Sequence, residues 1–394
     1  MARHRSGLKR LYDLKPKAHA LCSLLTRGSP AMARALDFFP AYAPPPNVQM
    51  LHDTSIASPM AAPRYAEELA RNQQFNREHP LTGAGVPPYP MIRRMLWEAR
   101  DIYVPGRIIM PVDRGIGRIV SHERRGNTNW AVTRPRPFRK PPIEIAGRAM
   151  GFLYMKHYGH LLTDVLGPIA LAVQQGLVTP ENPVTMVVAA RDNPVSVRFV
   201  EGMLRLGLAR DVVRLTHEDS AICESWLQGE VLVASGEHKY GMPEATDTLR
   251  RIFMAADDAG APPAVAHPKV YFQRGAVKLR QVAGEAALIE ALRDRGWHIF
   301  ESSWGNHAEQ LAVFGGFQTM VGVHGAGLAN LIFARPGARV VELQAGNARK
   351  TTGLFWAACA GLDYVSAYGG PEGADQSFTI DPAEVLALLD RLDA

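Results

Sequence analysis

Strands and helices alternate regularly through the last third of the chain, and this alternation constrains the fold more than any other feature of the sequence. Buried strands are predicted at residues 269–272, 297–301, 319–323, 338–343 and 364–367. Helices are predicted between or after them at 284–295, 306–314, 328–334, 350–360 and beyond Asp381-Pro382. Such units join through right-handed crossovers, so the sequence predicts an α/β fold with a parallel sheet.

The middle of the chain carries a second set of α/β signals. Strands are predicted at 185–190, 212–215 and 230–234, with helices at 151–175 and 195–206 and a hairpin or meander within 100–121. Residues 39–63 are rich in Pro, Ala and Ser and are expected to be an irregular connection, and DDAGAPPAVAH at 257–267 is the best linker. We therefore predict an N-terminal arm with an irregular or helical extension (1–95), followed by two α/β domains (96–260 and 261–394).

The composition is that of an ordinary globular protein. The chain has 394 residues, of which 47% are hydrophobic and 21% charged, enough for sizeable cores. Its cysteines, Cys22, Cys223 and Cys359, lie far apart in the sequence. This spacing counts against a disulfide framework and against a cysteine metal site, and it favours a reducing compartment.

Positive charge is concentrated at the N-terminus. Residues 1–40 hold eight Lys and Arg residues against two Asp residues, so this arm accounts for the whole net charge of +6. The arm could contact an anionic membrane or another polyanion, or it could be a loosely docked terminus. Since the rest of the chain has no excess charge, we expect no nucleic-acid partner.

No signal peptide is evident, and no apolar run reaches the roughly 18 residues that a membrane span needs. The sequence therefore predicts a cytoplasmic protein, at most peripheral to the inner membrane.

The strongest local motif is the stretch TMVGVHGAGLANLIFARPGARVVEL at 319–343. Gly325 and Gly327 separate a strand from a short helix and leave the backbone open to a ligand. Amides at a helix N-terminus have no partner inside the helix and attract anions. Glu342 lies at the end of the next strand, where a carboxylate can bind ribose hydroxyls. Alternatively, the glycines serve only a tight turn and Glu342 is solvated.

A dinucleotide-binding fold would have a third glycine where this chain has Asn330. The motif also lies late in the chain rather than at the head of a domain. Both features count against an NAD(P)-dependent oxidoreductase.

Ligands of parallel α/β sheets bind at the carboxyl ends of the strands. Arg274 and Arg280 follow the first strand of the second domain, and His324 with the Gly-rich turn follows the third. Together with Glu342, these groups could converge on a diphosphate and its ribose. Each arginine taken alone is explained as well by a surface position, but their shared place at strand ends favours the diphosphate site.

Three stretches of the second domain form a longer pattern: YFQRGAVKLRQVAGE at 271–285, the pair Glu309-Gln310, and VGVHGAGLANLIFARPGARVVEL at 321–343. This pattern resembles glycosyltransferase family 61, which includes capsular-polysaccharide enzymes of bacteria and sugar transferases of eukaryotes. The family's His-x-x-x-Asp element matches His160 and Asp164 in YGHLLTDVLG. The chain departs from the family pattern at Gly284-Glu285, where Asn-Glu is usual, and at Ala329, where Thr or Ser commonly precedes the asparagine.

The resemblance implies a GT-B-like fold, in which two Rossmann-like domains face each other across a cleft. Residues 96–260 would form the acceptor side and residues 261–394 would bind the nucleotide sugar. It also implies an inverting glycosyltransferase that needs neither a metal nor a cofactor and uses a UDP-sugar as the expected donor. The enzyme would transfer a hexose or pentose to a hydroxyl of a glycan or lipid-linked glycan in surface or capsular polysaccharide synthesis.

The resemblance also assigns roles to residues. Asp164 or His160, four residues apart on one helix face, would be the general base on the acceptor, unless the two form a purely structural hydrogen bond. A non-catalytic nucleotide-sugar-binding or scaffold protein is the competing function. The nucleotide-sugar site is expected to contain Arg274, Arg280, Glu285, His324, Gly325, Ala326, Gly327, Asn330 and Glu342.

Overall fold

The computed structural model describes residues 48–71, 91–106, 109, 111–113, 140–152, 155, 157–191, 193–233, 243–256, 267–274, 281–347 and 350–393. The basic arm, the linker at 257–266 and Arg280 lie outside these residues. We refer to residues 48–57 and 91–256 as the N-terminal lobe and to residues 267–393 as the C-terminal lobe.

A seven-stranded mixed sheet forms the N-terminal lobe. The order along the sheet is β1-β2-β7-β4-β5-β6, with β3 beside β2. β4 runs parallel to β5 and β7, and β5 runs parallel to β6, whereas β1, β2 and β3 pair in antiparallel fashion. The strands are β1 (Val48–Ala57), β2 (Met91–Pro105), β3 (Val112–Asp113), β4 (Ile143–Phe152), β5 (Val184–Ala189), β6 (Ala209–Leu215) and β7 (Ser220–Val233).

The first two strands correct the prediction for the N-terminal segment. Residues 48–57, predicted to be an irregular connection, form a ten-residue edge strand. β2 begins at Met91, inside the range 1–95 that was predicted to be an extension. An edge strand is buried less than a central one, and the polar run His52-Asp53-Thr54 interrupts the apolar pattern between flanking prolines. These features explain why the sequence did not predict a strand at residues 48–57.

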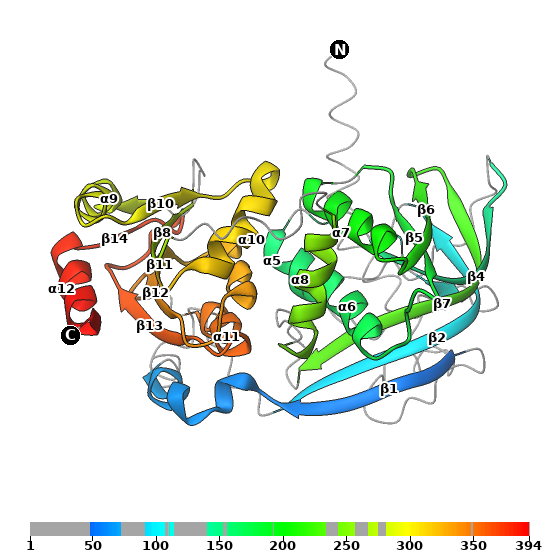
Figure 1. Ribbon diagram of the computed structural model, residues 1–394, viewed down its shortest axis with the longest axis horizontal. Helices are drawn as coiled ribbons and strands as arrows, with labels where there is room; N and C mark the ends of the chain where they lie inside the picture. The colour runs from blue at the N-terminus through cyan, green and yellow to red at the C-terminus, as the bar shows by residue number, and fades with distance from the viewer. Residues whose placement is uncertain are drawn as a thin grey trace, which may run out of the picture.

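The helices of the N-terminal lobe lie on the side of its sheet that faces the C-terminal lobe (Figure 1). α7 shows why they begin where they do, because the side chain of Asn193 accepts a hydrogen bond from the Ser196 amide at 2.9 Å and Pro194 occupies the first turn. The elements are α5 (Tyr158–His160), the π-helix η4 (Leu161–Leu166), α6 (Gly167–Gln174), α7 (Pro194–Arg205), η5 (Pro243–Ala245) and α8 (Thr246–Ala255).

The C-terminal lobe contains the predicted parallel sheet, and this prediction is confirmed. Its five strands lie in the order β10-β8-β11-β12-β13, and all neighbouring pairs are parallel. They are β8 (Lys269–Gln273), β10 (His298–Glu301), β11 (Thr319–Val323), β12 (Arg339–Gln344) and β13 (Asp363–Tyr368). A separate two-stranded ladder joins β9 (Val282–Ala283) to β14 (Phe378–Thr379).

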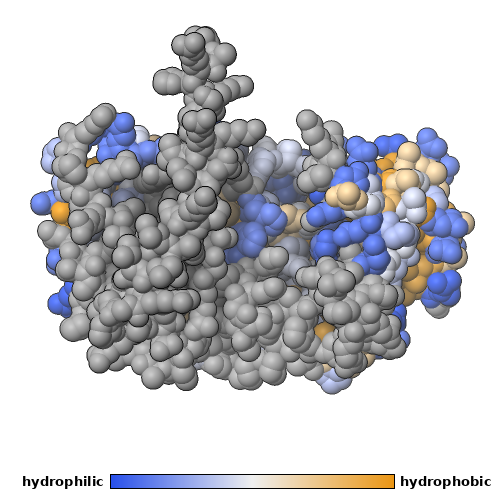
Figure 2. Space-filling model, turned by 180° about the vertical axis from the view of Figure 1, so that it is seen from behind, coloured by the Kyte–Doolittle hydropathy of each residue, from blue (hydrophilic) through white to orange (hydrophobic). Residues whose placement is uncertain are grey.

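Alternating side chains on these strands face two different cores. Tyr271 and Val321 point outward and pack with α9 (Glu285–Asp294) and α12 (Pro382–Asp393). Seen from behind, that outer end mixes hydrophilic with hydrophobic residues, as expected of amphipathic helices (Figure 2). Phe272 and Met320 point inward and belong to a second core. The inner elements are η6 (Trp304–Asn306), α10 (His307–Gly316), the 3₁₀-helix η7 (Ala326–Phe333) and α11 (Thr352–Cys359).

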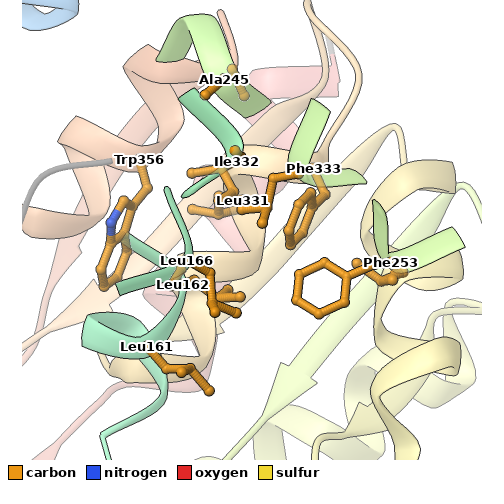
Figure 3. Close-up of a cluster of buried hydrophobic side chains, with 14 of the residues drawn as sticks. Leu161, Leu162, Leu166, Ala245, Phe253, Leu331, Ile332, Phe333 and Trp356 are labelled. Atoms are coloured by element: carbon orange, nitrogen blue, oxygen red, sulfur yellow. The ribbon is translucent and has the colours of Figure 1, made fainter. Parts of the chain in front are cut away.

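The inner core is continuous between the two lobes. Leu162 and Phe253 of the N-terminal lobe belong to the same buried cluster as Leu331, Phe333 and Trp356 of the C-terminal lobe. Figure 3 shows the side chains of η7 and η4 pointing toward one another in this region. The lobes are therefore joined by an apolar interface in which α5, η4 and α8 pack against η7.

Residues 58–71, which we call the crossing segment, add a second connection between the lobes. The segment joins β1 to β2 but lies against the C-terminal lobe (Figure 1). The Tyr65 hydroxyl donates to the Leu362 carbonyl at 2.8 Å, and Arg64 donates to the Gly361 carbonyl at 3.2 Å. The Tyr368 hydroxyl donates in turn to Glu68 at 3.0 Å.

Candidate functional site

The Gly-rich turn follows β11 directly. The His324 amide still belongs to the sheet, because it donates to the Leu343 carbonyl at 2.9 Å. η7 then begins at Ala326, two residues before the predicted start, and it is a 3₁₀-helix. The Leu328 amide donates to the Gly325 carbonyl at 3.1 Å. The preceding amides, of Ala326 and Gly327, stand at the helix N-terminus, where partial positive charge accumulates.

Close packing on both sides explains the two glycines of the turn. A Cβ added at Gly325 would lie 3.1 Å from Nε of Arg274, so this cationic side chain packs on the backbone of the turn. A Cβ added at Gly327 would lie 2.6 Å from Cζ of Phe272, which is buried in the inner core. The turn is therefore held between a buried aromatic ring and a guanidinium group.

His324 is paired with Glu342 across neighbouring strands. Nδ1 of His324 lies 2.6 Å from Oε1 of Glu342. The imidazole is 13% exposed and the carboxylate is fully buried. A carboxylate that accepts the Nδ1 proton fixes the tautomer and the orientation of the ring, and it directs Nε2 away from itself.

Complete burial of Glu342 does not fit the ribose contact predicted for it. Its second oxygen accepts hydrogen bonds from the hydroxyl of Tyr364 and, at 3.1 Å, from the amide of Gln344. Gly353 of α11 closes the remaining side, since a Cβ there would lie 2.2 Å from the same oxygen. The carboxylate acts inside the protein, on His324 and Tyr364, and presents no surface to a ligand.

Tyr364 and Gln344 are residues that the sequence interpretation missed. Burial and then the Glu342 charge raise the pKa of Tyr364 well above its ordinary value, so the hydroxyl stays protonated and donates. The alternation of side chains along β12 and β13 could have indicated this cluster. Glu342 and Gln344 are two residues apart on β12, Ser366 is the register partner of Glu342, and Tyr364 lies two residues before Ser366 on β13. All four share one sheet face.

A second histidine–carboxylate pair lies on the N-terminal lobe. Nδ1 of His160 lies 2.5 Å from Oδ2 of Asp164, and Thr163 donates to Oδ1 of the same carboxylate at 2.6 Å. The His160 side chain is 28% exposed and the Asp164 side chain 11%. His157 caps the helix, because its Nδ1 accepts from the His160 amide at 3.3 Å.

The backbone around this pair is unusual. Asp164 lies in the π-helix η4, which interrupts the helical run between α5 and α6. π-helical turns are rare and occur frequently at functional sites, because the inserted residue reorients its neighbours. The Thr163 hydroxyl also lies 2.9 Å from the Gly159 carbonyl, so its single proton is shared between that oxygen and the Asp164 carboxylate.

Tyr158 forms a hydrogen bond across the lobe interface. Its hydroxyl donates to Oδ1 of Asn330 at 2.5 Å. Burial raises the pKa of Tyr158 above its ordinary value, so the hydroxyl is a neutral donor at physiological pH. Asn330 in turn donates to Gln310 at 2.8 Å, and Gln310 donates to the Ser303 carbonyl at 2.6 Å. Asn330 is fully buried within this chain of hydrogen bonds.

His160 lies on α5, which contacts η7, the element that carries Gly327 and Asn330 and follows His324. Asp164 lies on η4, directly after α5. Glu285 is elsewhere: it begins α9 on the outer face of the sheet, where it accepts a hydrogen bond from Tyr271 at 2.7 Å. Arg280 lies outside the described residues.

Among the described residues, no group of three or more His, Cys, Asp or Glu side chains is placed to hold a metal ion. None of the described helices combines the length and the apolar character that crossing a membrane requires.

One family model covers most of the chain segment that carries these residues. Residues 158–341 match the sequence model of the family described as Glycosyltransferase 61. The match begins at Tyr158 and includes the His160–Asp164 pair, the Gly-rich turn and Asn330. No curated protein matches the chain. The match supports a glycosyltransferase, for which a sugar donor and a glycan acceptor are implied. Over residues 158–341, the chain is similar to glycosyltransferase family 61.

Proposed function

We propose that this protein is an inverting, metal-independent glycosyltransferase. It moves a hexose or pentose from a nucleotide sugar, with UDP as the expected nucleotide, to a hydroxyl of a glycan or lipid-linked glycan in surface or capsular polysaccharide synthesis. The observation that carries the proposal is the hydrogen bond from Tyr158 to Asn330, which joins the helix of the His160–Asp164 pair to the helix of the Gly-rich turn. The proposed base and the proposed anion site are therefore carried on two elements that contact each other across the lobe interface.

The general base in this proposal is His160. Both oxygens of Asp164 are already engaged, one by His160 and one by Thr163, and its side chain is the less exposed of the two. His160 has its Nδ1 held by the carboxylate, which leaves Nε2 to take a proton from an acceptor hydroxyl. Asp164 then orients the ring and stabilises the imidazolium that forms, as the buried carboxylate does in serine hydrolase triads.

The leaving group is stabilised from the C-terminal lobe. As the acceptor oxygen bonds to the anomeric carbon, the bond from that carbon to the diphosphate oxygen breaks and negative charge grows on the diphosphate. In this proposal Arg274, the imidazole of His324 and the amides of Ala326 and Gly327 stabilise that charge, which the packing of Arg274 on the turn supports. The proton of the acceptor hydroxyl is transferred to His160, and the nucleoside diphosphate leaves with the negative charge.

Glu342 and Asn330 have positioning roles in this scheme. The buried Glu342 carboxylate holds His324 in one tautomer, and Asn330 fixes the distance between the lobes through Tyr158 and Gln310. Neither side chain has surface for a nucleotide, and both act through a neighbour.

The architecture that we propose is GT-B-like, with the N-terminal lobe on the acceptor side and the C-terminal lobe on the donor side. The parallel C-terminal sheet and the parallel part of the N-terminal sheet support it, because helices of both lobes meet between the two sheets (Figure 1). The continuous apolar interface supports a donor and an acceptor lobe that stay docked.

Ligand binding is the first test. A thermal-shift series with UDP, GDP, CMP and their common sugar derivatives should raise the unfolding temperature for one nucleotide class, because a ligand that binds only the native state stabilises it. Arg274→Ala should weaken that binding by about 1–3 kcal/mol, the range for loss of a charged hydrogen bond. Arg295→Ala, which removes an exposed arginine at the outer end of the molecule, is the matched control and should bind normally.

Transfer is the second test. Release of nucleoside diphosphate from the donor identified above should fall below detection in His160→Ala and Asp164→Asn, with nucleotide affinity unchanged. Asp390→Asn on α12 should keep full activity. Binding with no donor turnover in the unmodified chain would favour a non-catalytic nucleotide-sugar-binding protein, and full activity in His160→Ala would remove our assignment of the base.

A further inference from the structure

One exposed aromatic side chain lies at the interface between the lobes. Ile143, Leu204 and Trp304 are the exposed large hydrophobic residues of the described chain, and Trp304 is 36% exposed. It begins η6, directly after the carboxyl end of β10, which is the sheet edge where ligands of parallel sheets bind. A single exposed apolar side chain is ordinary on a protein surface, so the case for a ligand rests on the position of Trp304 at this sheet edge between the two lobes.

Trp304 is also held rigidly. Ser303 and Asn306 form a capping box around it, and the Ser303 amide donates to Oδ1 of Asn306 at 2.8 Å. Gln310 donates to the Ser303 carbonyl at 2.6 Å and to Oδ1 of Asn306 at 3.0 Å. This is the same Gln310 that accepts from Asn330, so the residues on both sides of Trp304 belong to the hydrogen-bond chain that spans the lobe interface.

The neighbours of Trp304 come from both lobes. Its ring meets that of Tyr158 edge to face, with centroids 5.6 Å apart and planes inclined by 77°. Tyr158 stands two residues before His160 on the same helix, and η6 also contacts α7 of the N-terminal lobe. On the other side, Ser302 lies by the Gly-rich turn, since its Oγ is 3.5 Å from a Cβ built at Gly327.

We infer that Trp304 is a stacking platform for a sugar ring bound at the lobe interface. The inference rests on the proposed glycosyltransferase function and deepens it. One face of a pyranose presents C–H groups, and these pack on the electron-rich face of an indole, while the ring hydroxyls remain free for polar contacts. The ring belongs to the donor's transferred sugar or to the acceptor glycan, and the two sources share this chemistry.

Fluorine NMR of the full chain labelled with 5-fluorotryptophan tests the inference without requiring turnover. The chain has six tryptophans, and the resonance missing from Trp304→Phe identifies Trp304. The probes are UDP alone, then UDP-glucose, UDP-N-acetylglucosamine and UDP-xylose, then cellotetraose and xylotetraose. We expect the Trp304 resonance to shift with a sugar-bearing probe and to stay in place with UDP. A shift with a UDP-sugar assigns the platform to the donor, and a shift with an oligosaccharide assigns it to the acceptor.

Affinity measurements supply an independent readout. Trp304→Ala should weaken binding of the responding sugar probe by about fivefold to tenfold, the range for one lost aromatic contact, and leave UDP affinity within about twofold. Trp304→Phe should recover part of the loss, because a smaller ring still stacks. Leu204→Ala truncates a comparably exposed apolar residue, 39% exposed on α7, and should change neither affinity.

Two negative outcomes have different meanings. If UDP binds but no sugar probe moves the Trp304 resonance, or Trp304→Ala weakens UDP and UDP-sugars equally, the platform is refuted and the proposed glycosyltransferase stands. If neither UDP nor any UDP-sugar binds the unmodified chain, the proposed donor itself is wrong and the platform falls with it.

Discussion

The hydroxyl of Tyr158 donates a 2.5 Å hydrogen bond to Oδ1 of Asn330, a residue 172 positions later in the chain. This bond crosses the lobe interface between α5 and η7. The side-chain amide of Asn330 donates in turn to Gln310, so the orientation of each side chain depends on the one before it. The helix of His160 and the helix of the Gly-rich turn are thereby fixed relative to each other.

Tyr158→Phe should destabilise the protein by about 1–3 kcal/mol, because it leaves the buried oxygen of Asn330 without its donor. Donor turnover should fall as well, since the base is then less well held against the anion site. Urea unfolding and nucleotide release measure the two effects. In a double-mutant cycle with Asn330→Leu, the double variant should lose less stability than the sum of the single variants. Strictly additive losses would show that the bond does not couple the lobes.

Glu342→Gln should weaken UDP binding by about 1.5–3 kcal/mol, because the amide cannot replace the charged acceptor that holds His324. The matched control is Glu285→Gln. That residue also accepts from a buried tyrosine, Tyr271, but on the outer face of the sheet. Both variants should be less stable than the unmodified chain. In a calorimetric titration with UDP, only Glu342→Gln should lose affinity. Equal loss of affinity in both would remove the positioning role of Glu342.

Gly327→Ala should cost about 1–3 kcal/mol of stability, since the new methyl group would meet the ring of Phe272 at 2.6 Å in a filled core. Gly315→Ala is the matched control. Nothing lies within 4 Å of a Cβ at Gly315, which is in α10, so the change should stabilise by up to about 1 kcal/mol. Chemical denaturation measures both, and a neutral Gly327→Ala would contradict the packing role given to this glycine.

Arg148→Met should destabilise the protein at neutral pH and progressively less in acid. Burial alone would raise the pKa of Glu98, but hydrogen bonds from Arg148 and Ser225 and the Arg148 charge outweigh it, and the pKa lies below its ordinary value. Arg148 donates to the two oxygens of Glu98 at 3.2 and 3.0 Å. A lowered native pKa gives stability that is complete above the unfolded value, about 4.3, and is lost as the pH falls through the native value.

Thermal unfolding from pH 7 to pH 3 measures this effect. The gap in unfolding temperature between Arg148→Met and the unmodified chain should close as the pH drops below about 4. Arg295→Met breaks an exposed pair with Asp390 and should show only a small gap throughout. A gap for Arg148→Met that does not depend on pH would assign its effect to lost packing.

The C-terminal sheet was predictable because each strand there is a short apolar run flanked by a helix. β11 was predicted at Thr319–Val323 and has those bounds. The N-terminal sheet was harder, since pairing partners such as β2 and β7 are more than a hundred residues apart and β1 is a polar edge strand. Register over such separations is determined by tertiary contacts that no local pattern encodes.

The candidate site was predictable in its residue types and less so in their partners. The i, i+4 spacing of His160 and Asp164 predicted a shared face, and the two side chains are hydrogen bonded. The strand-end position of Glu342 suggested an accessible carboxylate, but Tyr364 on the neighbouring strand and Gly353 on α11 enclose it. The residues that enclose Glu342 come from elements later in the sequence, so the pattern of one strand could not predict its burial.

The crossing segment has a consequence for synthesis on the ribosome. Tyr65 is made 297 residues before Leu362, the residue to which its hydroxyl donates. At about 5–20 residues per second, that interval lasts about 15–60 s, during which the nascent chain carries Met60 and Tyr65 with no native surface to cover them. The crossing segment therefore cannot form its native contacts as it emerges, and these contacts wait until the chain around Leu362 has been translated.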